Sequence, residues 1–79
     1  MYCTYILKSK KNNQYYIGYT NNLDVRLKLH NTNKVQATKG RGPWEIFYTE
    51  QFQTEREAIN RERQIKSWKS RTAIERLKF

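Results

Sequence analysis

Two short runs of aromatic and β-branched residues, separated by a polar stretch, most constrain the fold of this chain. Residues 2–7 (YCTYIL) and 15–20 (YYIGYT) have the composition of β-strands, and the polar residues between them favour a turn. The pattern predicts a β-hairpin. Alternation along the strands would place Tyr5 and Tyr16 on a shared face, although a Tyr-rich sheet without chemistry explains both residues equally well. Gly18 indicates a bulge or a close approach by a backbone or a ligand.

A short helix and a long connection are expected after the hairpin. Asn21 can cap a helix in which Leu23 and Leu27 form an apolar i, i+4 pair, and the pattern ends near Asn31. Residues 32–43 (TNKVQATKGRGP) are polar, basic and interrupted by glycine and proline, which predicts an exposed connection.

The second half of the chain predicts one more strand and two helices. Residues 44–52 have strand composition. Thr54 and Glu57 form a capping box that opens a helix through Trp68, and Ser70 can cap a last short helix. The predicted order of elements is β-β-α-β-α-α, an α+β fold.

Size and charge limit what such a chain can do. Its 79 residues allow one compact domain over residues 1–79, whose site should be a shallow face or groove. Lys and Arg number 16 against 7 acidic residues, and the net charge of +9 favours a polyanionic partner. The single cysteine, Cys3, fits a reducing, cytoplasmic compartment. No apolar run is long enough for a signal peptide or a membrane span. A peripheral membrane protein is an alternative, but Lys and Arg are spread over strands, loops and helices and do not line one amphipathic helix, so we expect no membrane partner.

Three ionisable side chains fall on helix faces that should be apolar. Glu62 lies four residues from Ala58 and three from Ile65, which mark the inward stripe of the second long helix. A half-buried carboxylate needs a partner, so it indicates either an ion pair with an arginine or a cation site. On the first helix Arg26 and His30 form an i, i+4 pair beside the inward face. A core histidine and a surface-packed arginine are the structural alternatives.

Several short motifs follow one another over nearly the whole chain. They are residues 4–7 (TYIL), 16–23 (YIGYTNNL), Arg26, 30–31 (HN), 57–58 (EA), Glu62 and 65–66 (IK). In this order and spacing they resemble the signature of the GIY-YIG nuclease superfamily, in particular its small single-domain members. The resemblance implies a three-stranded antiparallel sheet flanked by helices, hydrolysis of phosphodiester bonds in DNA, and one divalent cation, Mg²⁺ or Mn²⁺.

The resemblance also assigns roles to individual residues. Tyr5 and Tyr16 match the tyrosines of the first two motifs, and Arg26 matches the catalytic arginine. Glu62 matches the metal-binding glutamate, and His30 matches a histidine that part of the family has in its active site. Cysteine and threonine replace the glycine and isoleucine of the first motif here. The asparagine that some relatives place after the glutamate helix has no clear counterpart.

These residues suit phosphodiester hydrolysis on physical grounds. The reaction builds negative charge on the phosphate oxygens, which the guanidinium of Arg26 and a cation on Glu62 would stabilise most in the transition state. One carboxylate is sufficient for Mg²⁺, because this ion keeps several waters. Our hypothesis is that Tyr16 positions or deprotonates the water, that Tyr5 hydrogen-bonds within the site, and that His30 relays a proton.

Basic residues around the expected site should bind the phosphate groups of nucleic acid, DNA rather than RNA. They are Lys8, Lys10, Lys11, Lys34, Lys39, Arg41, Lys66, Lys69 and Arg71. A solvated surface role is the alternative for each of them. Trp44 and Trp68 are expected to pack within the protein rather than to stack on bases.

A second class of function remains open, a nucleic-acid-binding module that has the fold but no turnover. The complete set of five polar residues favours the nuclease, because a pure binder could lose Glu62 without penalty. A single domain would have low specificity or would take it from a homodimer or a protein partner.

Overall fold

The computed structural model describes residues 1–78, whose helices and strands follow the order expected from the sequence. The elements are β1 (Tyr2–Ser9), β2 (Tyr15–Thr20), α1 (Leu23–Asn31), a 3-10 turn (Gln36–Thr38), β3 (Trp44–Phe52), α2 (Glu55–Trp68) and α3 (Arg71–Arg76). Apart from the 3-10 turn and a first strand two residues longer than predicted, these are the expected elements.

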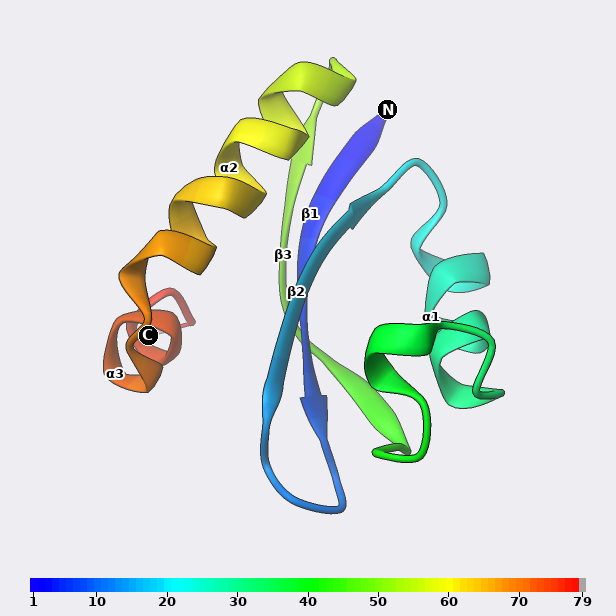
Figure 1. Ribbon diagram of the computed structural model, residues 1–79. Coiled ribbons are helices and arrows are strands. Elements are labelled where there is room, and N and C mark those ends of the chain that lie inside the picture. The colour runs from blue at the N-terminus through cyan, green and yellow to red at the C-terminus, as the bar shows by residue number, and fades with distance from the viewer. Residues whose placement is uncertain (79) are drawn as a thin grey trace.

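The three strands form one antiparallel sheet in the order β2-β1-β3. Helix α1 covers one face, and α2 and α3 lie on the other (Figure 1). The central strand β1 is buried without interruption from Cys3 to Leu7, because both faces of the sheet are covered. In the register Tyr5 lies opposite Gly18 and Leu7 lies opposite Tyr16. The prediction that the two tyrosines share a face is therefore confirmed.

Each face of the sheet has its own small core. The core on the α1 side is made by Cys3, Tyr5, Leu7 and Trp44. The core on the α2 side is made by Ile6, Ile65 and Ile74. The buried centre of the α2 side is thus aliphatic, whereas the core on the α1 side contains the phenol of Tyr5, the thiol of Cys3 and the indole of Trp44.

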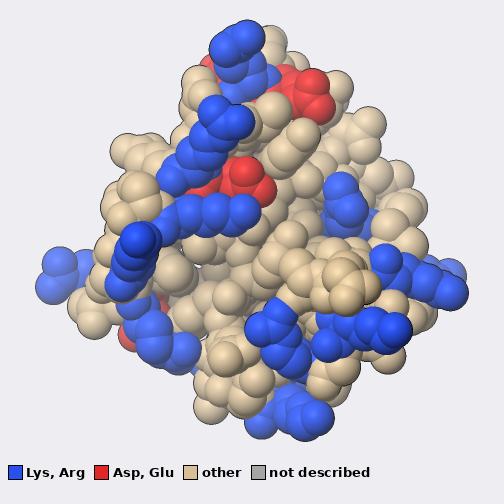
Figure 2. All heavy atoms as spheres, viewed as in Figure 1, with Lys and Arg blue, Asp and Glu red and all other residues tan. Residues whose placement is uncertain are grey.

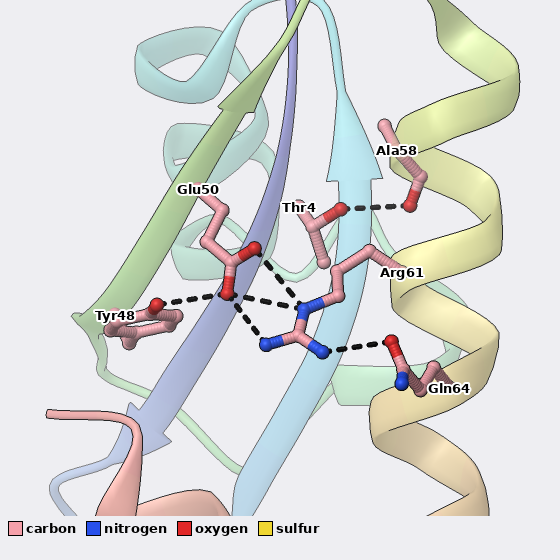
Figure 3. Close-up of polar contacts among 6 residues, drawn as sticks. All are labelled: Thr4, Tyr48, Glu50, Ala58, Arg61 and Gln64. Atoms are coloured by element: carbon pink, nitrogen blue, oxygen red, sulfur yellow. Dashed lines mark hydrogen bonds and ion pairs between the residues drawn. The ribbon is translucent and has the colours of Figure 1, made fainter.

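An ion pair and a hydrogen bond hold α2 on the sheet (Figure 3). The Thr4 hydroxyl donates to the Ala58 carbonyl at 2.8 Å. Arg61 donates to the Glu50 carboxylate through Nε and Nη2 at 3.0 to 3.2 Å, and the Tyr48 hydroxyl donates to the same carboxylate at 2.8 Å. These contacts fix the rotation of α2 about its own axis, and with it the residues that α2 directs toward β2.

Side-chain caps set the starts of the helices. The capping box predicted at Thr54 is present, since its hydroxyl accepts from the Glu57 amide at 3.2 Å and the Glu57 carboxylate accepts from the Thr54 amide at 3.3 Å. Ser70 caps α3 as predicted. Helix α1 is capped by Asn22 and not by Asn21, because the chain needs one residue more than expected to leave β2. Across the described part of the chain, no helix has both the length and the apolar character that crossing a membrane requires.

The connection between α1 and β3 is not the fully exposed loop that residues 32–43 predict. Its 3-10 turn buries the side chain of Thr38 completely. Asn31 closes the segment by accepting from the Trp44 amide at 2.6 Å and donating to the Trp44 carbonyl at 3.1 Å. The polar composition of this segment predicts exposure, but a buried hydroxyl is stable where it finds a buried hydrogen-bond partner.

Candidate active site

The Tyr5 phenol lies across the edge strand β2, in the space that Gly18 leaves free. Tyr5 is buried, and a Cβ atom at Gly18 would lie 2.5 Å from its hydroxyl oxygen. At such a distance a side chain at position 18 excludes the phenol. Gly18 therefore marks a close approach, but the group that approaches is the Tyr5 side chain of the neighbouring strand and not the backbone or ligand expected from the sequence.

A buried chain of hydrogen bonds runs from Tyr5 through His30 to Thr38. The Tyr5 hydroxyl lies 3.0 Å from His30 Nε2, and Thr38 Oγ1 lies 2.7 Å from His30 Nδ1. Thr38 Oγ1 also lies 3.5 Å from the Val35 carbonyl. A consistent assignment has Thr38 donating to Val35, His30 Nδ1–H donating to Thr38, and Tyr5 donating to Nε2. His30 is 1% exposed, so it holds the phenol from behind and does not face solvent.

Burial controls the protonation of this pair. Burial and, to a smaller extent, the nearby charge of Arg26 together lower the pKa of His30 to about 4, so the ring is neutral at pH 7. Burial also raises the pKa of Tyr5 above the usual value for a phenol, and Tyr16 adds to this effect. Arg26 lowers the pKa of Tyr5 and Glu62 raises it. Tyr5 is therefore a hydrogen-bond donor at neutral pH and not a base.

Tyr16, Arg26 and Glu62 reach the same region from three different elements. The centre of the Tyr16 ring is 4.9 Å from that of His30 and 6.4 Å from that of Tyr5. Arg26 on α1 and Glu62 on α2 are near enough for their charges to act on the Tyr5 hydroxyl. The five residues selected from the sequence thus gather around one stretch of β2.

Glu62 is largely buried but weakly partnered. Its side chain is 16% exposed, and its ion-pair partner among the described residues is Lys66, which is 3.5 Å away and 51% exposed. The structural alternative, pairing with an arginine, is found at Glu50 instead. Because an exposed i, i+4 ion pair contributes only about 0.3–0.5 kcal/mol, Lys66 does not prevent the carboxylate from binding another cation.

The donor set around Glu62 fits one hard divalent cation. Within residues 1–78 no three His, Cys, Asp or Glu side chains gather in one place. Mg²⁺ does not need such a cluster, because one or two carboxylates, water and substrate phosphates complete its coordination. Zn²⁺, which takes three or four protein ligands, does not fit this site.

Tyr19 borders the site and was missed in the sequence analysis. Its hydroxyl donates to Glu55 at 3.4 Å. Partial burial and Glu55 raise its pKa, while the charges of Glu62 and Arg26 act on it in opposite directions. Strand alternation could have identified it, because Tyr19 and Tyr16 lie on opposite faces of β2 and Tyr19 is on the side of α2.

The region opens to solvent through shallow hollows, as expected for a chain of this size. Arg26 lines two of them, each of about 250 Å³, which also share Thr20 and Asn21. Figure 2 shows a hollowed face with basic side chains on both sides and an acidic group among them. A phosphodiester backbone can approach such an open site without a conformational change.

Four of the nine predicted phosphate-binding residues line one groove beside this site. Arg41, Lys66, Lys69 and Arg71 surround a hollow of about 460 Å³ between the hairpin and the α2–α3 turn. The other five do not line this groove: Lys8, Lys10, Lys11, Lys34 and Lys39. Lys10 lies 3.8 Å from Glu45, and the Lys8 ammonium lies 5.8 Å from the centre of the Tyr15 ring.

The two tryptophans have packing roles, as predicted. Trp44 is 3% exposed and meets the Tyr16 ring edge to face at 6.4 Å between ring centres. Trp68 is half-buried beneath the Arg61 guanidinium, which lies 5.4 Å from the centre of its ring. Trp44 therefore supports Tyr16 and presents no free face to a base.

Comparisons with known proteins identify the family of this chain. The family model for the GIY-YIG catalytic domain matches residues 1–76. A UPF0213 protein of Oceanobacillus iheyensis is 44% identical over 63 residues, which cover 78% of this chain and 72% of that protein. One of Clostridium perfringens is 48% identical over 63 residues, covering 78% of this chain and 67% of the relative.

A solved structure shows the same fold. The solution NMR structure of a UPF0213 protein from Bacillus halodurans superposes with a TM-score of 0.59 at 37% sequence identity, and the match covers 98% of this chain and 82% of that one. The family match, the relatives and the structure lead to one conclusion: the chain belongs to the GIY-YIG nuclease family.

Proposed function

We propose that the chain is a metal-dependent endonuclease that hydrolyses phosphodiester bonds in DNA. The observation that supports this most directly is the gathering of Tyr5, Tyr16, Arg26, His30 and Glu62 around β2. Two of these side chains, Arg26 and Glu62, carry opposite charges, and within residues 1–78 Arg26 has no ion pair and Glu62 pairs only with the exposed Lys66.

Arg26 has the chemistry needed to bind and stabilise a reacting phosphate. It is half-buried between two open hollows, so its guanidinium can reach a phosphate that enters either one. Its charge is always present, and its planar donors match two phosphate oxygens at once. In a partly water-excluded site such contacts stabilise the extra charge of the transition state more than the ground state.

Tyr5, Tyr16 and His30 have different roles in proton transfer. Tyr5 stays protonated and is held by His30, so it donates within the site. Tyr16 is half-buried beside them and is the phenol that can contact a water on the open side. His30 contacts the hydroxyls of Tyr5 and Thr38, so a proton that it relays toward the site must pass through Tyr5. His30 therefore acts as a positioning residue for Tyr5.

Glu62 would hold the divalent cation, Mg²⁺ or Mn²⁺. When bound, this ion supplies Lewis-acid stabilisation of phosphate charge. Lys66, its exposed neighbour, can turn toward a phosphate once Glu62 is occupied.

The test is cleavage of plasmid, single-stranded, branched and RNA substrates with Mg²⁺ or Mn²⁺ and with EDTA. Glu62→Gln removes the charge and keeps the shape, and Glu45→Gln, at an exposed position away from the site, is the matched control. We expect cation-dependent cleavage of DNA that is lost in Glu62→Gln and retained in Glu45→Gln. Binding without cleavage under all conditions would show the non-catalytic module instead, and metal-independent cleavage would indicate a contaminant or another mechanism.

A further inference from the structure

The groove between the hairpin and the α2–α3 turn differs in character from the hollows around Arg26. Its rim carries the cations Arg41, Lys66, Lys69 and Arg71, and its floor carries Ile17, Ile65 and Ile74 beside Tyr15. We propose that this groove receives one unpaired nucleotide of the DNA strand that leads to the active site. This inference rests on the proposed function, and it names the class of substrate: DNA with an unpaired base next to the cut.

The charge of the rim favours an anionic occupant. Arg41 comes from the α1–β3 connection, whereas Lys66, Lys69 and Arg71 come from α2 and from the turn into α3, so cations face the groove from both sides. Among the described residues, Arg41 Nη1 donates to the Gln14 side chain at 3.3 Å, a neutral partner. Lys66 and Arg71 have carboxylate partners on their own helices, Glu62 at 3.5 Å and Glu75 at 3.6 Å, so the excess positive charge of the rim comes mainly from Arg41 and Lys69, and it attracts an anion.

Lys69 is held in a backbone conformation that lysine disfavours. It ends α2 with φ 50° and ψ 37°, a left-handed conformation in which glycine or asparagine is usual. A non-glycine residue there costs about 1 kcal/mol, so stability alone would favour glycine. A strained residue at the rim of a groove is a reason to look for a ligand that its side chain serves.

The apolar floor selects a base in preference to a phosphate. Ile17 is half-buried and Ile74 is 7% exposed, whereas Ile65, at 1%, adds almost no accessible surface. Phosphates gain nothing from aliphatic surface, whereas the face of a base does. Paired bases keep their faces stacked inside the duplex, so a base must be unpaired to enter. The Arg71 guanidinium, 4.6 Å from the centre of the Tyr15 ring, adds a flat wall beside this floor.

The groove borders the active site at Lys66. This residue lines the groove and also contacts Glu62 at 3.5 Å. A strand whose scissile phosphate lies at Arg26 and Glu62 would therefore place a neighbouring nucleotide in the groove.

The test measures binding in EDTA by fluorescence anisotropy with three labelled DNA hairpins. One is blunt, one has a short single-stranded extension, and one has the same extension built from abasic sugars. We expect the base-bearing extension to tighten binding about tenfold over the blunt hairpin, as stacking of a base on a protein surface does. The abasic extension keeps every phosphate, so it should keep the part of this gain that the rim cations supply and lose the part that comes from the base.

Variants on the two walls of the groove locate the effect. Lys69→Gly and Arg41→Gln should each reduce the preference for the extension several-fold. Lys28→Gln, at an exposed position of α1, removes the same charge outside the groove and should weaken all three probes equally. Lys69→Gly relieves a left-handed conformation, so we expect this variant to fold at least as well as the parent chain.

The outcomes separate this inference from the proposed function. Equal binding of blunt and extended hairpins, an abasic extension that binds as well as the base-bearing one, or a preference that survives both wall variants would each overturn the groove assignment. A protein that cleaves DNA but shows no such preference refutes the groove alone. A protein that shows the preference but never cleaves supports the groove and refutes the nuclease.

Discussion

Glu50 and Glu62 are two carboxylates with similar burial and very different surroundings. Glu62 belongs to α2, and Glu50 on β3 contacts the same helix through Arg61. Their side chains are 23% and 16% exposed. Glu50 accepts from Arg61 at 3.0 to 3.2 Å and from Tyr48 at 2.8 Å, so most of its acceptor capacity is used. Glu62 has the ammonium of Lys66 at 3.5 Å.

The difference shows that burial by itself does not mark a functional carboxylate. A partly buried charge must be compensated. At Glu50 the protein provides the compensation, and the result is a strut between α2 and β3. At Glu62 the compensation is incomplete, which leaves a role for a cation that arrives with the substrate.

Exchanging each carboxylate for its amide is the sharpest way to break this comparison. Glu62→Gln should reduce cleavage by about 10³-fold, because an electrostatic contact to the transition state is lost, while the free energy of unfolding changes by less than about 0.5 kcal/mol. Glu50→Gln should lower the free energy of unfolding by about 3 kcal/mol, because Arg61 is left without its partner, and should keep kcat within a few-fold. Cleavage rates and urea unfolding measure both. A reversed pattern would contradict the assignment of roles.

A side chain at position 18 should disturb the candidate active site without affecting the Glu50–Arg61 ion pair. In Gly18→Ala the new methyl group displaces the Tyr5 hydroxyl, so we expect a loss of about 10²-fold in kcat and about 2 kcal/mol in stability. Gly40→Ala is the control, since its φ is 79° with open space around it. It should cost about 1 kcal/mol through backbone strain and leave kcat unchanged. Equal activity of the two variants would show that the position of Tyr5 is unimportant.

The pH dependence of stability should come from the α1 side of the sheet. The pKa of His30 is about 4 in the folded chain and about 6.5 when unfolded, so below pH 6.5 the unfolded state binds more protons. The stabilisation is complete above pH 6.5 and decreases as the pH falls toward 4, by up to about 3 kcal/mol. Urea unfolding of the parent and His30→Gln between these pH values isolates this contribution from that of the carboxylates. Parallel curves for the two proteins would rule it out.

Lys69→Gly should give the smallest effect and the opposite sign. Relief of the left-handed conformation is expected to raise the free energy of unfolding by about 1 kcal/mol. Lys69→Ala, which removes the charge but keeps the strain, is the control and should not stabilise the protein. If Lys69→Gly is less stable than the parent, the Lys69 ammonium contributes to folding. The groove would then resemble the structural Glu50–Arg61 ion pair and not the incompletely paired Glu62.

The sequence was sufficient to predict the elements and the shared face of Tyr5 and Tyr16. Local signals acted there: the strand composition around Tyr5 and Tyr16, and the capping box at Thr54, correspond to what is observed. Thr38 could not be predicted, because its burial depends on a polar segment closing over His30 on a neighbouring element.

The sequence also could not predict which charged residues form ion pairs. Arg61 could have joined Glu62, its chain neighbour, but adjacent helical residues point in different directions, and Arg61 instead reaches Glu50 on β3. The nine candidate cations could be named but not sorted, since which of them share a groove depends on how the hairpin lies against the α2–α3 turn.

The central position of β1 has a consequence for how the protein loses activity on heating. Amide hydrogens of a strand that is paired on both edges and covered on both faces exchange with solvent mainly when the whole molecule opens. Because Tyr5 belongs to this strand, fraying at the termini or in the hairpin turn leaves the phenol in place. The midpoint of thermal inactivation should then coincide with that of global unfolding.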